Sequence, residues 1–136
     1  MTSSPSPRPR RYLALFFLVL VTAAASACGD GATAPEPDPV VSGSWSGTSQ
    51  GLTLRLTLSE GAGGAVSGSG NITGGTDNLA LTVRQGTHTY PSLSLILGAQ
   101  GFEDLNFAGT LVSETQIAGT LNGSGFDNFN FNLSRQ

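Results

Sequence analysis

The chain has 136 residues; six are arginine, none is lysine, nine are acidic and one is cysteine. All nine acidic residues follow Cys28, where only three of the arginines lie, so this part of the chain has a net charge of −6. Nucleic-acid binding and docking on anionic lipid both need clustered Arg or Lys, and this composition argues against both. The length suits one small domain.

The first 27 residues have the pattern of a secretory signal peptide. A start with three arginines and no acidic residue, Met1–Arg11, precedes the uncharged run Leu13–Ala25. This run is shorter than the roughly 18–20 apolar residues of a membrane-spanning helix, so an uncleaved anchor is the weaker alternative.

The end of the leader, Ala25-Ser26-Ala27-Cys28, resembles the lipobox of bacterial lipoproteins, with Ala25 where the family usually has leucine. The resemblance implies that Cys28 is lipidated and becomes the first of 109 mature residues. The alternative is an ordinary signal cleaved near Ala27, which would leave a free thiol in an oxidising compartment.

The same resemblance implies a location in the cell envelope. Gly29, rather than aspartate, follows the cysteine, which in the family indicates sorting to the outer membrane. Acyl chains on Cys28 would hold the protein at the membrane, since two or more chains bind far more stably than one.

The segment after Cys28 reads as a tether, residues 28–40. Pro35, Pro37 and Pro39 alternate with Glu36 and Asp38. Alternating prolines favour extended polyproline II, and at about 3.1 Å per residue the tether would span some 30 Å. The globular domain is expected over residues 41–136.

From Val40 onward, apolar residues recur at every second position, which predicts strands rather than helices. Gly43–Gly47 supplies a first strand with Trp45 on its apolar face. The other predicted strands are Leu52–Leu58, Val66–Ile72, Leu79–Val83, Leu93–Leu97, Leu105–Leu111, Ile117–Leu121 and Phe129–Leu133.

Eight short strands joined by short turns predict an all-β domain in which neighbours in sequence pair antiparallel. The predicted fold is an eight-stranded up-and-down barrel, because closure removes both sheet edges. A two-sheet β-sandwich is the alternative. A transmembrane barrel is a weaker rival, since it needs longer strands with an apolar outer face, and here that face carries Ser, Thr and Asn.

Two residues at the ends of the domain resemble the calycin arrangement of lipocalins. Gly43-Ser44-Trp45 matches the family's Gly-x-Trp, and Arg135 stands where an arginine near the C-terminus packs over the indole. The resemblance implies a cation–π contact between Trp45 and Arg135 that closes one end of the barrel. The alternative is that Trp45 is simply core and Arg135 a frayed end.

The sequence offers little material for catalysis. His88, the single histidine, falls in the predicted connection Gly86–Pro91, and acidic residues cluster in turns. The chain lacks a Gly-x-Ser-x-Gly elbow and any Cys/His metal spacing. We expect no enzyme activity, no cofactor and no metal site.

A repeated pattern marks one end of the predicted barrel. Gly101-Phe102-Glu103-Asp104 is echoed by Gly125-Phe126-Asp127-Asn128, and alternate turns of a meander fall at the same end. Two interpretations remain open: the phenylalanines are inward plugs beside ordinary turn residues, or they form a contact surface for a ligand or partner. The candidate rim residues are Phe102, Phe126, Asp77, Asp104 and Asp127.

These features give two functional hypotheses. The first is a lipid-anchored envelope lipoprotein whose barrel is a non-catalytic structural or interaction module, contacting another envelope protein. The second is a calycin-like carrier of a small hydrophobic ligand. Interior space separates them, because a carrier needs a cavity and a presenting module does not.

Overall fold

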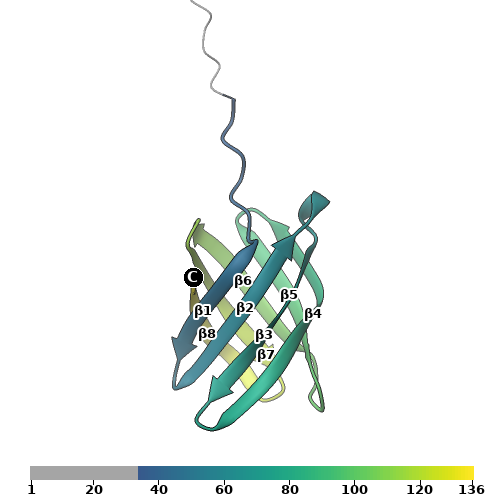
Figure 1. The fold of residues 1–136 in the computed structure, drawn as a ribbon, viewed down its shortest axis with the longest axis vertical. Coiled ribbons are helices and arrows are strands. Elements are labelled where there is room, and N and C mark those ends of the chain that lie inside the picture. The colour runs from purple at the N-terminus through teal and green to yellow at the C-terminus, as the bar shows by residue number, and fades with distance from the viewer. Residues whose placement is uncertain (1–33) are drawn as a thin grey trace, which may run out of the picture. The chain divides into compact units, whose positions relative to one another are not determined.

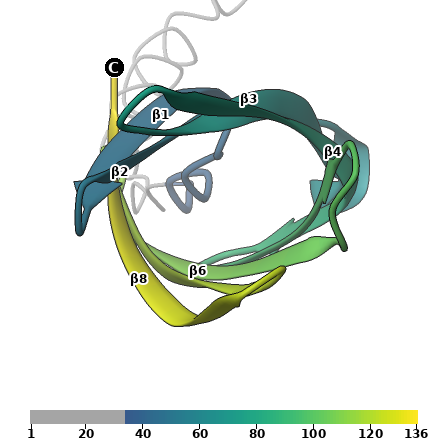
Figure 2. The same cartoon turned by 90° about the horizontal axis from the view of Figure 1, so that it is seen from below.

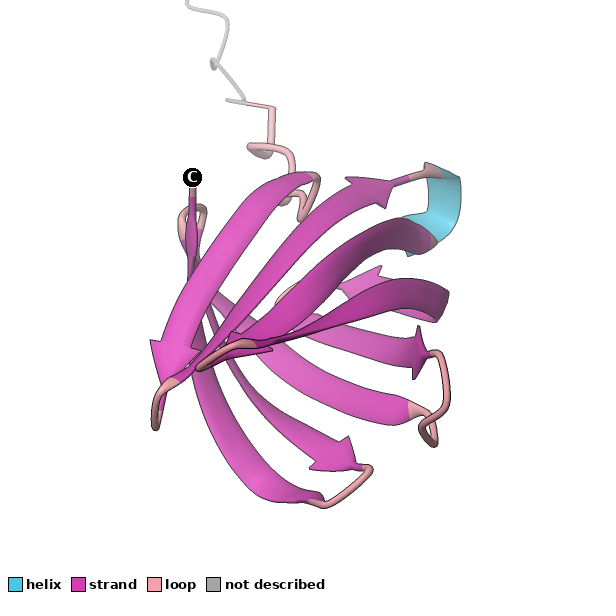
Figure 3. Ribbon diagram, turned by 60° about the horizontal axis from the view of Figure 1, so that its bottom comes forward, coloured by secondary structure: helices cyan, strands magenta, loops and turns pink. Residues whose placement is uncertain are grey.

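The computed structural model describes residues 34–136, so the predicted signal peptide and Cys28 lie outside the described residues. Pro37–Gln136 forms one compact unit. Its strands are β1 (Gly43–Ser49), β2 (Leu52–Glu60), β3 (Val66–Gly74), β4 (Asp77–Thr89), β5 (Ser92–Ala99), β6 (Leu105–Ser113), β7 (Gln116–Gly123) and β8 (Phe126–Arg135). A 3₁₀ turn, η1 (Ala62–Gly64), joins β2 to β3 (Figure 3). Within residues 34–136, no helix has the length and apolarity needed to cross a membrane.

Each strand pairs antiparallel with the next, and β1 pairs with β8, so the sheet closes on itself (Figures 1 and 2). The predicted eight-stranded up-and-down barrel is confirmed, and the two-sheet sandwich alternative is wrong. Closure follows from the sequence because every strand has one apolar face and every connection is short.

Two of the turns show why adjacent strands pair. Gln50 and Gly51, between β1 and β2, both have positive φ, 48° and 83°. Ser124 and Gly125, between β7 and β8, have φ of 48° and 91°. Positive φ at both central residues is the type I′ geometry, whose twist matches that of the paired strands.

The interior is filled by apolar side chains from every strand. Nineteen hydrophobic residues of the described chain are buried, and Trp45, Phe107 and Phe131 are the largest at 1% exposure or less. Phe107 fits because Gly109 and Gly119, paired across β6 and β7, leave room for its ring. A Cβ at Gly109 would lie 2.9 Å from that ring, and one at Gly119 would also meet it.

Strand β4 runs further than the alternation predicts. Its register with β5 shifts between Val83 and Gln85, so Arg84 is an extra, bulged residue. One inserted residue moves the following side chains to the opposite face. Thus His88, which we expected in a connection, lies in the strand and points inward, only 5% exposed.

Candidate functional site

The meander gives the barrel two distinct ends (Figure 1). Residues Pro37–Ser42 enter at one end, together with the C-terminus and the turns that follow β2, β4 and β6; we call this the tether end. The turns after β1, β3, β5 and β7 lie at the opposite end, which we call the far end.

At the tether end, Arg135 packs over Trp45. The guanidinium carbon lies 4.4 Å from the centre of the indole, and the two residues are paired across the β1–β8 junction. Trp45 is 1% exposed, and its Nε1 donates to the carbonyl of Val41 at 2.8 Å. The contact therefore covers a buried aromatic ring at the point where the barrel closes.

The same guanidinium also binds three backbone carbonyls. Nε donates to Glu114 at 2.8 Å, Nη2 donates to Val40 at 2.7 Å, and Nη1 donates to Ser42. These carbonyls belong to the β6–β7 turn and to the strap, as we call Val40–Ser42. Arg135 thus joins three segments that are far apart in sequence.

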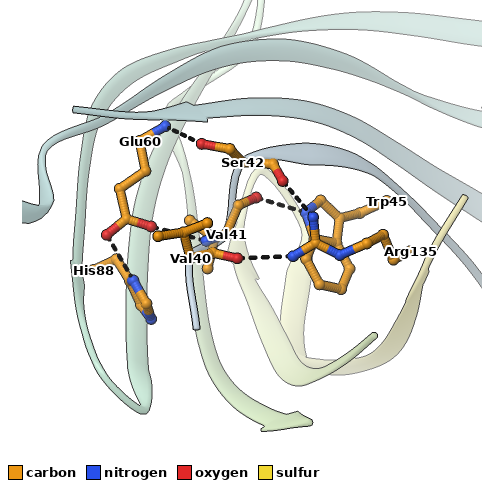
Figure 4. A network of polar contacts seen from close by, with 7 residues as sticks. All are labelled: Val40, Val41, Ser42, Trp45, Glu60, His88 and Arg135. Atoms are coloured by element: carbon orange, nitrogen blue, oxygen red, sulfur yellow. Dashed lines mark hydrogen bonds and ion pairs between the residues drawn. The ribbon is translucent and has the colours of Figure 1, made fainter. Parts of the chain in front are cut away.

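A second polar group holds the strap from the other side (Figure 4). Glu60 Oε2 accepts the Val41 amide at 2.8 Å, and Ser42 Oγ accepts the Glu60 amide at 2.8 Å. Glu60 Oε1 lies 2.9 Å from Nδ1 of His88. The strap is therefore fixed by Arg135 and Glu60, and its middle residue, Val41, is fully buried.

Sequence reasoning missed the Glu60–His88 pair. The side chains are 12% and 3% exposed, and Nε2 of His88 is buried without a hydrogen-bond partner among the described residues. A carboxylate beside a buried histidine is a common catalytic or metal-binding arrangement. Here, however, the parts of the chain that the structure describes hold no group of three His, Cys, Asp or Glu side chains suited to a metal.

The candidate rim residues fall at the far end, but the two phenylalanines differ. Phe102 lies in the β5–β6 turn and is 56% exposed. Phe126 begins β8, packs against the core, and meets Phe129 edge-on with ring centres 5.5 Å apart. Phe126 thus matches the inward-plug interpretation, and Phe102 matches the surface interpretation.

The acidic rim residues are placed in three different ways. Asp104 lies 3.2 Å from Nε of Arg84, the bulged residue of β4. Asp127 accepts from the side-chain amide of Asn128 at 2.9 Å. Asp77 begins β4 and pairs with Gly74 across the turn. The Arg84–Asp104 ion pair is exposed and therefore stabilises little. The far end is thus a polar surface.

Several hollows of the barrel open to solvent. Two of them have volumes of about 380 Å³, one on the outer wall of β4–β6 and one beside the strap. The interior, by contrast, is occupied by the buried aromatic and aliphatic side chains described above.

Comparison with known proteins found no match: no family model matched the chain, and neither did any curated protein or solved structure. The fold defines the class, a closed eight-stranded up-and-down β-barrel.

Proposed function

We propose that this protein is a bacterial outer-membrane lipoprotein, anchored by acyl chains on Cys28, whose barrel is a non-catalytic module that presents its far end to another envelope protein. The lipobox-like Ala25-Ser26-Ala27-Cys28 supports the anchor, and the alternating prolines support a tether between anchor and barrel.

One observation carries the proposal: the barrel has a filled interior and an exposed aromatic residue at the end opposite the strap. Side chains such as Trp45, Phe107 and Phe131 occupy the space that a carried ligand would need. Phe102 stands in the longest far-end connection, between β5 and β6, with its side chain mostly in solvent. Exposed aromatic residues are favoured anchors at protein interfaces.

The carrier hypothesis, with a calycin-like barrel, keeps one supporting observation. The Trp45–Arg135 contact is the arrangement that the resemblance implies. A carrier nevertheless requires interior space and a few polar groups to orient its ligand. The filled core favours the presenting module.

Site-specific photocrosslinking in native host cells tests the proposal. A photoreactive phenylalanine analogue replaces Phe102 in the full chain, and the matched control places it at Thr57 on the outer wall of β2. Mass spectrometry of the purified protein then identifies both the crosslinked partner and the chemical state of Cys28.

We expect a discrete envelope-protein adduct at position 102, none at position 57, and an acylated Cys28. An unmodified Cys28 thiol would overturn the anchor, and equal labelling at both positions would overturn the far-end contact.

Phe102→Ser should change the free energy of unfolding by less than about 0.5 kcal/mol, whereas Phe126→Ser should lower it by about 2 kcal/mol, because only Phe126 packs on the core.

A further inference from the structure

A buried polar pair holds the strap, and neither the anchor nor the far-end contact accounts for it. Glu60 and His88 come from β2 and β4, so both belong to the barrel wall, whereas Val41 belongs to the chain that enters it. One carboxylate joins all three: its Oε1 lies 2.9 Å from Nδ1 of His88, and its Oε2 accepts the Val41 amide at 2.8 Å (Figure 4). The ring of His88 therefore acts on the strap through Glu60.

The contact with Glu60 determines which nitrogen of the neutral His88 ring carries the hydrogen. An ionised carboxylate only accepts hydrogen bonds, so Nδ1 carries the hydrogen and donates it to Glu60. Nε2 then holds a lone pair, and it is buried without a hydrogen-bond partner among residues 34–136. The pair is thus suited to a single proton while the strap is closed, as it is in the structure.

A second proton has no favourable position in this arrangement. On Nε2 it would create a buried donor without an acceptor in the described part of the chain, which costs free energy. On Glu60 it would remove the charge of the carboxylate, and charge-assisted hydrogen bonds, such as the one that the Val41 amide donates, are about twice as strong as neutral ones. In either position the added proton weakens the closed arrangement.

The other titratable groups at the tether end lie on two sides of the pair. The ring of Tyr90, from the β4–β5 turn, meets His88 edge-on with ring centres 6.5 Å apart. The guanidinium of Arg135, from β8, binds the strap carbonyls of Val40 and Ser42. Two exposed carboxylates line the hollow beside Arg135, those of Asp38 and Glu114. Of these groups, only Tyr90 contacts His88 directly.

We propose that Glu60 and His88 form an acid-sensitive latch, which holds the strap closed while the ring is neutral and releases it when the pair takes up a proton. Lowering the pH favours the state that binds more protons. With the strap open, water can accept from Nε2, and the attraction between Glu60 and an imidazolium is kept because both side chains are carried by barrel strands. Acid therefore favours the open strap.

Opening would change how the barrel is attached. Release of the three strap residues would lengthen the tether by about 10 Å, at roughly 3.3–3.6 Å per residue. It would also remove the Val41 carbonyl from Nε1 of Trp45. The latch requires neither acylation of Cys28 nor a partner at the far end.

Two native side chains report on the latch in the full chain in detergent. Trp45 is the single tryptophan and donates to the Val41 carbonyl, so acrylamide quenching of its fluorescence reports strap opening. His88 is the single histidine, so its ring signals in an NMR titration report protonation. His88→Gln removes the titrating ring and keeps an amide that can donate to Glu60. The matched control is Glu114→Gln, which removes an exposed carboxylate at the same end.

Between about pH 8 and about pH 5, where histidine changes charge, we expect quenching of Trp45 in the wild type to rise at least about threefold. The rise should follow the His88 ring signals, persist in Glu114→Gln and be absent in His88→Gln, while the β-sheet circular dichroism stays constant. The proposal is overturned if quenching does not change with pH, if His88→Gln keeps the wild-type response, or if sheet structure is lost together with the strap. If His88→Gln does not fold, quenching that fails to follow the His88 signals in the wild type still overturns it.

Discussion

Arg135 links several segments of the chain at the tether end. It covers Trp45 and binds the carbonyls of Glu114, Val40 and Ser42. The planar guanidinium suits this role, because it offers several donors in a fixed plane and stacks on an aromatic face. Lysine could supply the positive charge but not the planar set of donors.

We therefore expect Arg135→Ala to lower the free energy of unfolding by about 2–4 kcal/mol, through loss of the cation–π contact and of charge-assisted hydrogen bonds. Arg135→Lys should recover less than half of this loss. Urea unfolding of the full chain measures both. The control is Arg55→Ala on the outer wall of β2, expected within about 0.5 kcal/mol. An equal loss from both alanine variants would contradict a special role for Arg135.

Two of these side chains differ in how far the sequence predicts their positions. The contact between Arg135 and Trp45 is what the resemblance to lipocalins implies. It also agrees with the inward alternation of β8, which persists as long as a strand has no inserted residue. His88 was misplaced because the bulge at Arg84 reverses the faces after Val83. Nothing in the local composition marks that bulge, so the Glu60–His88 pair could not be predicted.

At the scale of single elements, the junction of β1 and β8 is the weakest of the eight. It has two registered pairs, Trp45 with Arg135 and Ser46 with Ser134, whereas every other neighbouring pair of strands has six to nine. The amide of Gln136 extends the contact by donating to the Ser44 carbonyl at 2.9 Å. The closure is therefore concentrated at the tether end, next to Arg135.

This asymmetry predicts uneven amide protection along β8. Within residues 128–132, backbone amides point alternately toward β1 and toward β7. The amides that point toward β1 should exchange with solvent at least about tenfold faster than those that point toward β7, because local opening starts where the fewest contacts hold the strands together. Hydrogen exchange followed by NMR on the full chain in detergent resolves the two sets. Uniform protection along both edges of β8 would show that the junction is as firmly closed as the rest of the barrel.

The sequence predicts the order and pairing of the strands. It does not predict how the side chains in the turns are placed. Short connections forced neighbours to pair, and the period of two assigned each inward face. The different burial of Phe102 and Phe126 could not be predicted, because the sequences around them match. Phe126 is drawn onto the core through Phe129, while Phe102 sits in a longer turn that carries it into solvent.

For the whole molecule, the filled interior connects fold to function. A barrel of eight strands either holds one small ligand or is packed with its own side chains. Here inward residues from all eight strands reach the middle, and Phe107 occupies the room left by Gly109 and Gly119. Groups that can meet a partner therefore lie on the outside, as Phe102 does at the far end.

Removing that central ring tests whether the interior is truly occupied. Phe107→Ala should lower the free energy of unfolding by about 3–5 kcal/mol, since it removes buried contacts and leaves a cavity. An apolar cavity of this kind stays dry and accepts small aromatic molecules. Benzene should therefore raise the melting temperature of the variant and leave that of the wild type unchanged, as thermal unfolding by circular dichroism would measure. Equal stabilisation of the wild type by benzene would mean that the native barrel has free interior space, and it would return the carrier hypothesis to first place.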